Sequence, residues 1–271
     1  MSNLTKKRTS KNYEEKLANL PTNSRENIQA AVNNFKKFVL EEHESTPDQI
    51  CGELIEIKKT KGDEEYEDIL YNFLQEWIDW NISKKAGAYT IKTRFSIIKS
   101  YLYHLGVKSH PQDINLLLSF PRKITEEKYP LKKQEIRDLV HAQARHPKRQ
   151  ALYLALSSSG MRQGEALQIK KKDLDFSLER IMVRIKAEYT KTKTGRTTFV
   201  SKECNDKIMT YFQNLEDGDY VFTNSHGDFK TRGRSEQMAL SNALEVLGYN
   251  EKYSSNRFYK ITSHSFRAYF T

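Results

Sequence analysis

Apolar residues in the first 120 positions recur every three or four residues, which is the spacing of helices that bury one face. The pattern predicts long helices that begin near Thr22, after Thr46-Pro47, near Glu64 and near Tyr89, and a short helix over 113–119. Polar or proline-containing segments separate them, and Gly106 ends the fourth long helix. Since no alternating run interrupts this pattern, residues 22–120 are expected to form an all-α domain.

The segment 121–130 contains two prolines and no hydrophobic period, which is typical of a linker. Helical periodicity resumes at Leu131, and a second apolar run leads into the small-residue turn at 157–160. These two runs predict two helices after the linker, so a second domain is expected to begin at Leu131.

Beyond Asp173 apolar and polar residues alternate over 181–186 and again over 197–201, with a basic segment that contains a glycine between them. This pattern predicts a β-hairpin. Helices are expected over 203–214, over 235–247 with Met238 turned inward, and from Thr262 or Ser263 onward. The predicted fold class is therefore mainly α with a small β-sheet, in which a helical domain precedes a mixed α/β domain over 131–271.

The sequence has 45 Lys and Arg residues against 35 Asp and Glu, a formal net charge of +10. Such a surplus favours a polyanionic partner, and double-stranded DNA is the first candidate. Basic residues gather in the segment 1–21, expected to be a flexible arm, around the fourth long helix, and at the hairpin tip. The expected DNA-binding residues are Lys84, Lys85, Lys92, Arg94, Lys99, Lys191 and Arg196.

Other classes of protein fit the composition poorly. The two cysteines, Cys51 and Cys204, are too few for a disulfide framework and too far apart for a zinc site. No apolar run approaches the roughly 20 residues of a membrane span, and no signal peptide precedes the first helix. We expect a soluble, cytoplasmic, nucleoid-associated protein that does not contact a membrane.

The stretch 157–169 places Arg162 at a turn between two apolar helical runs. Such a turn lies against the core, so the guanidinium has little water around it, and its fork of donors suits a pair of phosphate oxygens. Glu165 can share a helical face with Arg162 and orient that fork. An ordinary turn with a surface salt bridge would contain the same residues. Other parts of the sequence are needed to distinguish a phosphate-binding arginine from such a turn.

A second group suited to an anion lies at the end of the sequence. His264 and Arg267 are three residues apart at the predicted start of a helix, so they share one face. The helix N-terminus itself favours an anion. Lys191 and Lys193 lie at the hairpin tip, where a lysine is usually only solubilising but can also enter a groove.

Arg162 with Glu165, Lys193 on a hairpin tip, and the His264-x-x-Arg267 motif, in this order and spacing, resemble the tyrosine recombinase (phage integrase) family. The resemblance extends from about Thr22 to the last residue and includes the domain order, a helical core-binding domain before a catalytic domain. It implies a site-specific recombinase or integrase that cleaves and rejoins DNA through a 3′-phosphotyrosyl intermediate.

The resemblance also implies a role for each residue. Arg162 and Arg267 would hold the non-bridging oxygens of the scissile phosphate. His264 would donate to the phosphate or manage the proton of the nucleophile, and Glu165 would support both Arg162 and His264. Lys193 would protonate the leaving 5′ oxygen, with Lys191 in the same turn as the alternative. Neither a metal nor a cofactor is expected, because the arginines supply the charge.

The sequence departs from the family pattern after Arg267. Family members continue to a nucleophilic tyrosine on a late helix, whereas Tyr269 is only two positions past Arg267 and faces elsewhere. Tyr253 and Tyr259 match no family position. The nucleophile is therefore expected to be absent from these residues, with the catalytic domain incomplete at its C-terminus, as in a truncated protein.

Two rival interpretations stay open. A type IB topoisomerase shares the chemistry and the catalytic fold, although the separate helical domain favours the recombinase. A non-catalytic DNA-binding relative would keep the fold without needing so many cationic groups around one phosphate. Family members act as homo-tetramers on DNA, and this chain alone is expected to be a monomer.

Overall fold

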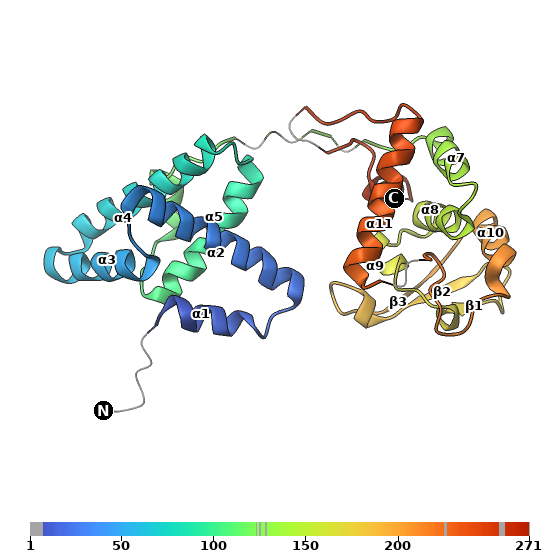
Figure 1. Cartoon of the computed structure of the whole chain (residues 1–271), viewed down its shortest axis with the longest axis horizontal. Coiled ribbons are helices and arrows are strands. Elements are labelled where there is room, and N and C mark those ends of the chain that lie inside the picture. The colour runs from blue at the N-terminus through green and yellow to red at the C-terminus, as the bar shows by residue number, and fades with distance from the viewer. Residues whose placement is uncertain are drawn as a thin grey trace. The chain divides into compact units, whose positions relative to one another are not determined.

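In a computed structural model the chain forms two compact units, Met1–Ile124 and Thr125–Thr271 (Figure 1). The structure describes residues 8–270 except 123, 125, 128, 225, 226 and 255–257. The division falls inside the segment 121–130 that was expected as a linker. Phe120 packs against the core of the first unit and Tyr129 against the core of the second, so apolar anchors lie on both sides of the division.

The first unit is all-α. Its helices are α1 Ser10–Leu17, α2 Thr22–His43, α3 Pro47–Lys61, α4 Asp63–Ser83, α5 Ala88–Leu105 and α6 Pro111–Leu117. The four long helices begin close to the predicted positions. α3 starts at Pro47 because Thr46 forms a capping box with Gln49, and α5 ends where Gly106 adopts a φ of 102°.

Residues 10–17 correct the expectation of a flexible arm over 1–21, because they form α1. The Thr9 hydroxyl accepts a hydrogen bond from the N–H of Asn12 and caps this helix. Leu17 is buried, and the ring centroid of Tyr13 lies 5.0 Å from that of Tyr101 in an edge-to-face contact. Tyr13 thus packs on the core of the first unit, and Leu17, four residues on, is buried on the same face of α1. Residues 1–7 of the expected arm lie outside the described residues.

The second unit combines helices with a three-stranded sheet. Its elements are α7 Lys133–Ala142, α8 Pro147–Ser159, α9 Gln163–Ala166, η1 Lys171–Asp173, β1 Leu174–Asp175, β2 Met182–Ile185, η2 Ala187–Tyr189, β3 Arg196–Phe199, α10 Lys202–Phe212, α11 Phe229–Val246 and α12 Ser263–Phe270. The helices α7, α10 and α12 pack on α8. Buried residues occupy nearly every side of α8, which therefore forms the centre of this core.

The predicted hairpin is confirmed. β2 and β3 pair antiparallel, from Met182 opposite Phe199 to Ile185 opposite Arg196. β1 adds a short antiparallel strand beside β2 that the pattern did not predict. The connection from β2 to β3 is longer than a tight turn and contains η2.

One predicted core residue is wrong. Met238 on α11 is 61% exposed. The buried face of α11 includes Leu240, Ala243 and Leu244, and Met238 lies two positions before Leu240, nearly on the opposite side of the helix. No helix within the described residues combines the length and the apolar character that crossing a membrane requires.

Candidate active site

The turn after α8 brings Arg162 to the edge of the core. Gly160 ends α8 with a φ of 63°, a conformation that favours glycine. A Cβ atom there would lie 2.6 Å from Cδ1 of Phe270, so the close approach of α12 also requires glycine. Met161 is fully buried and Arg162 is the N-cap residue of α9. The Arg162 backbone therefore follows directly on a turn that is fixed by Gly160 and by the buried Met161.

Glu165 holds the Arg162 side chain and is itself only 2% exposed. Its Oε2 accepts from the backbone N–H of Arg162 at 2.9 Å, and its Oε1 accepts from Arg162 Nη1 at 2.9 Å. Arg196 donates to the same carboxylate through Nη1 at 3.2 Å and Nη2 at 2.6 Å. Burial raises the pKa of Glu165, but the hydrogen bonds from Arg196 and Arg162 outweigh burial and lower the pKa to about 2.

These four hydrogen bonds use the acceptor capacity of a carboxylate, which has about four lone-pair positions. Among the described residues the Glu165 carboxylate bonds only to Arg162 and Arg196, so it holds Arg162 directly. The structure shows no bond from Glu165 to His264. The partner that sequence reasoning missed is Arg196, which was expected to bind DNA.

α12 is positioned by its buried face. Phe266 is fully buried and stacks on Tyr153 of α8, with ring centroids 5.0 Å apart. At the start of α12, Ser265 Oγ accepts from the backbone N–H of Thr262 at 3.0 Å. With Phe266 turned inward, the neighbouring face carries His264, which is exposed, and Arg267, which is partly buried.

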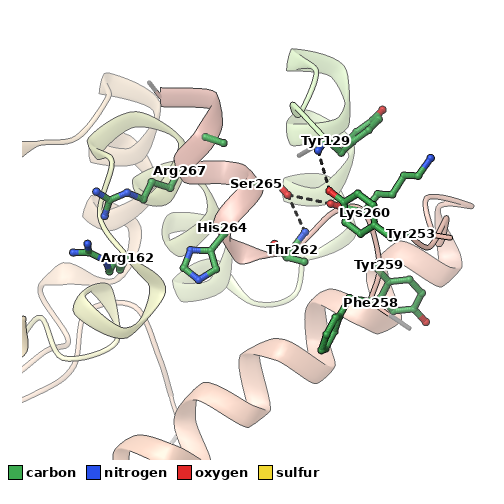
Figure 2. A pocket seen from close by; sticks show the side chains of 11 residues that line it. Tyr129, Arg162, Tyr253, Phe258, Tyr259, Lys260, Thr262, His264, Ser265 and Arg267 are labelled. Carbon is green, nitrogen blue, oxygen red and sulfur yellow. Dashed lines mark hydrogen bonds between the residues drawn. The ribbon is translucent and has the colours of Figure 1, made fainter. Parts of the chain in front are cut away.

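Arg162, His264 and Arg267 line one cavity of about 600 Å³. Figure 2 shows the side chains of Arg162 and Arg267 extending in the same direction from α9 and α12. Nη1 of Arg267 is buried and has no hydrogen-bond partner among the described residues. Burying a guanidinium nitrogen without an acceptor costs free energy.

The far side of the cavity has aromatic and basic walls that the sequence did not assign to a site. They are formed by Tyr129, Tyr253, Phe258, Tyr259 and Lys260 (Figure 2). Tyr253 Oη accepts from the backbone N–H of Tyr129 at 3.0 Å, which ties the segment before α7 to the segment before α12. Only the tertiary fold brings these two segments together, so sequence spacing carries no signal for them.

The hydroxyl groups of the tyrosines near this cavity donate to carboxylates or belong to a residue that lines another cavity. Tyr129 donates to Glu135 at 2.5 Å, and that hydrogen bond raises its pKa to about 12. Tyr259 donates to Glu245 at 2.7 Å, which likewise raises its pKa. Tyr269 does not line the arginine cavity but a separate one between α7, α8 and α10.

Lys193 is exposed on the loop between β2 and β3 and is not among the residues that line the arginine cavity. Its φ is 57°, and its backbone N–H donates to the carbonyl of Thr190 at 3.4 Å. Lys191 is exposed on the same loop. The structure thus does not bring either lysine to the cavity, and the choice between them stays a prediction.

The basic residues of the helical unit fall into two groups. Lys84, Lys85 and Lys92 are exposed, whereas Arg94 and Lys99 are partly buried. Arg94 donates from Nη1 to the fully buried Asn81 at 3.0 Å, so it stabilises the fold in addition to any role in binding. Lys84 also has local partners, since its Nζ lies 3.3 Å from Glu41 and 5.2 Å from the ring centroid of Trp80.

The fold is that of the tyrosine recombinases. An integrase of transposon Tn1549 in complex with transposon right end DNA is 18% identical, with 89% of this chain and 84% of that chain covered and a TM-score of 0.54. The same integrase with circular intermediate DNA is 15% identical, covers 89% and 85%, and has a TM-score of 0.54. The XerH recombinase bound to palindromic difH substrate is 16% identical, covers 81% and 64%, and has a TM-score of 0.50.

The chain belongs to the phage integrase family, because the family model matches residues 130–271, just over half of the chain. This family contains DNA-cleaving and DNA-rejoining tyrosine recombinases. No curated protein sequence is significantly similar to the chain. Within the described residues no three His, Cys, Asp or Glu side chains lie together as a possible metal site.

Proposed function

We propose that this protein is a site-specific DNA recombinase or integrase that acts on duplex DNA in the cytoplasm, in association with the nucleoid. The observation that carries the proposal is the pair Arg162 and Arg267, which line one cavity with His264, together with the buried and unpartnered Nη1 of Arg267. Two guanidinium groups that converge from separate elements suit the non-bridging oxygens of one phosphodiester.

In the proposed reaction the arginines stabilise charge that develops at phosphorus. Arg162 and Arg267 hold the two non-bridging oxygens, and each such donor contributes roughly a hundredfold or more to the rate. His264 donates a further hydrogen bond to the phosphate, and Glu165 keeps Arg162 oriented. No charge-neutralising metal is required for this arrangement of residues.

Lys193 is the proposed general acid for the leaving 5′ oxygen, with Lys191 as the alternative. Because Lys193 lies outside the cavity, the loop that carries it has to move toward the phosphate when DNA binds. Loss of the true general acid is rescued on a substrate whose leaving oxygen is replaced by sulfur, since a thiolate leaves without a proton. The lysine variant that shows this rescue identifies the residue.

The attacking tyrosine is none of Tyr129, Tyr253, Tyr259 and Tyr269. The occupied hydroxyls of the first three and the separate cavity of Tyr269 support this part of the proposal. A DNA site is first selected from random duplexes by its binding to this protein. These 271 residues, incubated with a nicked suicide duplex that carries this selected site, should bind the duplex without forming a covalent adduct. An adduct mapped by mass spectrometry to one of these tyrosines would overturn this assignment.

Chemistry at the phosphate is tested with a small external nucleophile in place of the tyrosine. Hydrogen peroxide added to the protein and its selected duplex should produce strand breaks at one phosphate. Arg162→Ala and Arg267→Ala should each slow this reaction about a hundredfold or more. Arg184→Ala, which removes an exposed arginine paired with Asp175, is the matched control. Absence of any protein-dependent break would favour a non-catalytic DNA-binding relative.

DNA binding itself should depend on backbone charge, given the net charge of +10 and the exposed lysines of both units. Log affinity for duplex DNA is expected to fall linearly with log salt concentration. We further propose that the chain is a monomer without DNA and that a homo-tetramer assembles on DNA. Relaxation of any supercoiled plasmid without a preferred site would favour the topoisomerase alternative.

A further inference from the structure

We propose that Arg196 is a positioning residue, which saturates the Glu165 carboxylate so that Arg162 keeps donors free for the phosphate. This inference rests on the proposed role of Arg162 as a phosphate ligand. It also replaces the expectation that Arg196 contacts DNA.

The hydrogen bonds at Glu165 are divided unequally between the two arginines. Arg196 makes a bidentate pair, with Nη1 to Oε1 at 3.2 Å and Nη2 to Oε2 at 2.6 Å. The Arg162 side chain donates to Glu165 through Nη1 alone, at 2.9 Å. Nη1 is also the one side-chain nitrogen of Arg162 for which the described residues provide a hydrogen bond. The Arg162 side chain lines the cavity and is 43% exposed, so its remaining donors are accessible to an anion there.

Removing Arg196 would change how strongly Glu165 competes with an anion in the cavity for the donors of Arg162. Glu165 would keep its negative charge in a nearly dry position, with Arg162 as its one remaining cationic partner. A carboxylate in that position favours a bidentate guanidinium. Arg162 would then turn both arms of its fork toward Glu165, and those arms would be lost to an anion in the cavity.

The same contact connects two parts of the proposed site. Arg196 is the first residue of β3, directly after the loop that carries Lys191 and Lys193. Glu165 belongs to α9, which follows the Arg162 turn. The Arg196–Glu165 pair therefore fixes one end of the lysine loop to the element that holds Arg162.

The test measures binding of inorganic phosphate to the 271-residue protein by phosphorus NMR titration. Arg162→Ala should abolish measurable binding, and Arg196→Ala should weaken it about tenfold, the size of one lost charge-assisted hydrogen bond. Arg196→Lys should recover part of the loss, because an ammonium offers one strong donor to the carboxylate. Arg184→Ala, on the neighbouring strand, is the matched control with unchanged affinity.

The double variant Glu165→Gln/Arg196→Ala separates positioning from a general loss of structure. A neutral amide no longer captures Arg162, so phosphate affinity should return toward the wild-type value. A double variant that binds phosphate no better than Arg196→Ala overturns the inference. Wild-type affinity in Arg196→Ala would overturn it as well.

A second measurement decides between positioning and DNA contact. For Glu165→Gln/Arg196→Ala, in which Arg162 is again available to the phosphate, the slope of log DNA affinity against log salt should equal that of the wild type, because Arg196 itself makes no phosphate contact. A slope smaller by about 0.9, the value for one phosphate contact, would show that Arg196 binds DNA. If the wild type does not bind phosphate, or Arg162→Ala binds it normally, the proposed phosphate site fails and not the role of Arg196 alone.

Discussion

The two units differ in what they bury. In the described part of the helical unit Asn81 is the one buried polar residue, and every ion pair there joins side chains that are at least 28% exposed. The second unit buries several charged groups: Glu135, Glu165, Asp173, Arg232 and Glu236. The helical unit is thus held together by apolar contacts, and the second unit also by buried electrostatics.

This difference follows from what each unit has to hold in place. Aromatic and aliphatic packing, as between Phe35 and Phe73, orders a helical core without help from charges. A guanidinium in a partly dry cavity keeps its orientation when a fixed side chain accepts a hydrogen bond from it, and in this unit that acceptor is a buried carboxylate whose other acceptor positions are occupied. Glu165 is the buried acid that fixes the positive charge of Arg162 in this way.

The largest expected effect comes from breaking a buried pair in the second unit. Glu236, 4% exposed, accepts from Arg149 Nε at 2.5 Å and Nη2 at 3.1 Å. Glu236→Ala should lower the free energy of unfolding of this unit by about 3 to 5 kcal/mol, because it leaves the partly buried Arg149 without its carboxylate partner. Gln237→Ala, an exposed neighbour on α11, is the control.

The two units can be followed separately in the full chain. Both tryptophans, Trp77 and Trp80, lie in α4, so their fluorescence reports on the helical unit, whereas far-ultraviolet circular dichroism reports on both. Urea unfolding of Glu236→Ala should shift the dichroism transition and leave the fluorescence transition in place. A fluorescence transition that moves by the same amount would break the comparison, since the units would then unfold together.

A smaller effect is the pH dependence that Glu165 brings to the second unit. Its pKa is lowered from 4.5 to about 2, so its contribution to stability is complete above pH 4.5 and is lost as pH falls toward 2. The shift corresponds to about 3 kcal/mol as an upper value. The stability difference between wild type and Glu165→Gln should therefore shrink as pH falls from 5 to 2.5. A constant difference would contradict the lowered pKa, and exposed Glu179 provides the control Glu179→Gln.

The smallest effect concerns the helical unit. Thr46 Oγ1 accepts from the N–H of Gln49 at 3.3 Å, and the N–H of Thr46 donates to Gln49 Oε1 at 3.0 Å. Thr46→Ala should cost about 1 kcal/mol. It should shift the fluorescence transition and the part of the dichroism change that comes from the helical unit, and leave the unfolding of the second unit in place. Thr60→Ala in the last turn of α3 should have little effect. If Thr46→Ala lowered the free energy of unfolding by more than Glu236→Ala does, the larger effect would lie in the helical unit, contrary to this comparison.

Most of the fold was predictable because its elements depend on local pattern. α3 starts at Pro47 after the Thr46 cap, α5 ends at Gly106, and the two strands of the predicted hairpin pair with each other. The errors lie where tertiary contacts overrule the local pattern. α1 packs on the first unit through Tyr13, which contacts Tyr101 far along the chain, and Met238 is exposed because Leu240 and Leu244 set the buried face of α11.

The candidate site was predictable in part for the same reason. Arg162 with Glu165, and His264 with Arg267, are each three residues apart on one element, so spacing alone places each pair together. The role of Arg196 was not predictable, because it contacts Glu165 across 31 residues. Spacing also gave no position for Lys193, whose loop ends outside the cavity.

The sequence by itself determined the helices, the hairpin and the two cationic pairs, since capping, periodicity and residue spacing act over a few residues. Only the tertiary structure decided that the pairs share one cavity, that α12 approaches Gly160, and that Glu165 serves two arginines. The physical reason is that burial and desolvation depend on which distant elements pack together. A carboxylate on a short helix becomes a strong, fully occupied acceptor only when β3 brings Arg196 against it.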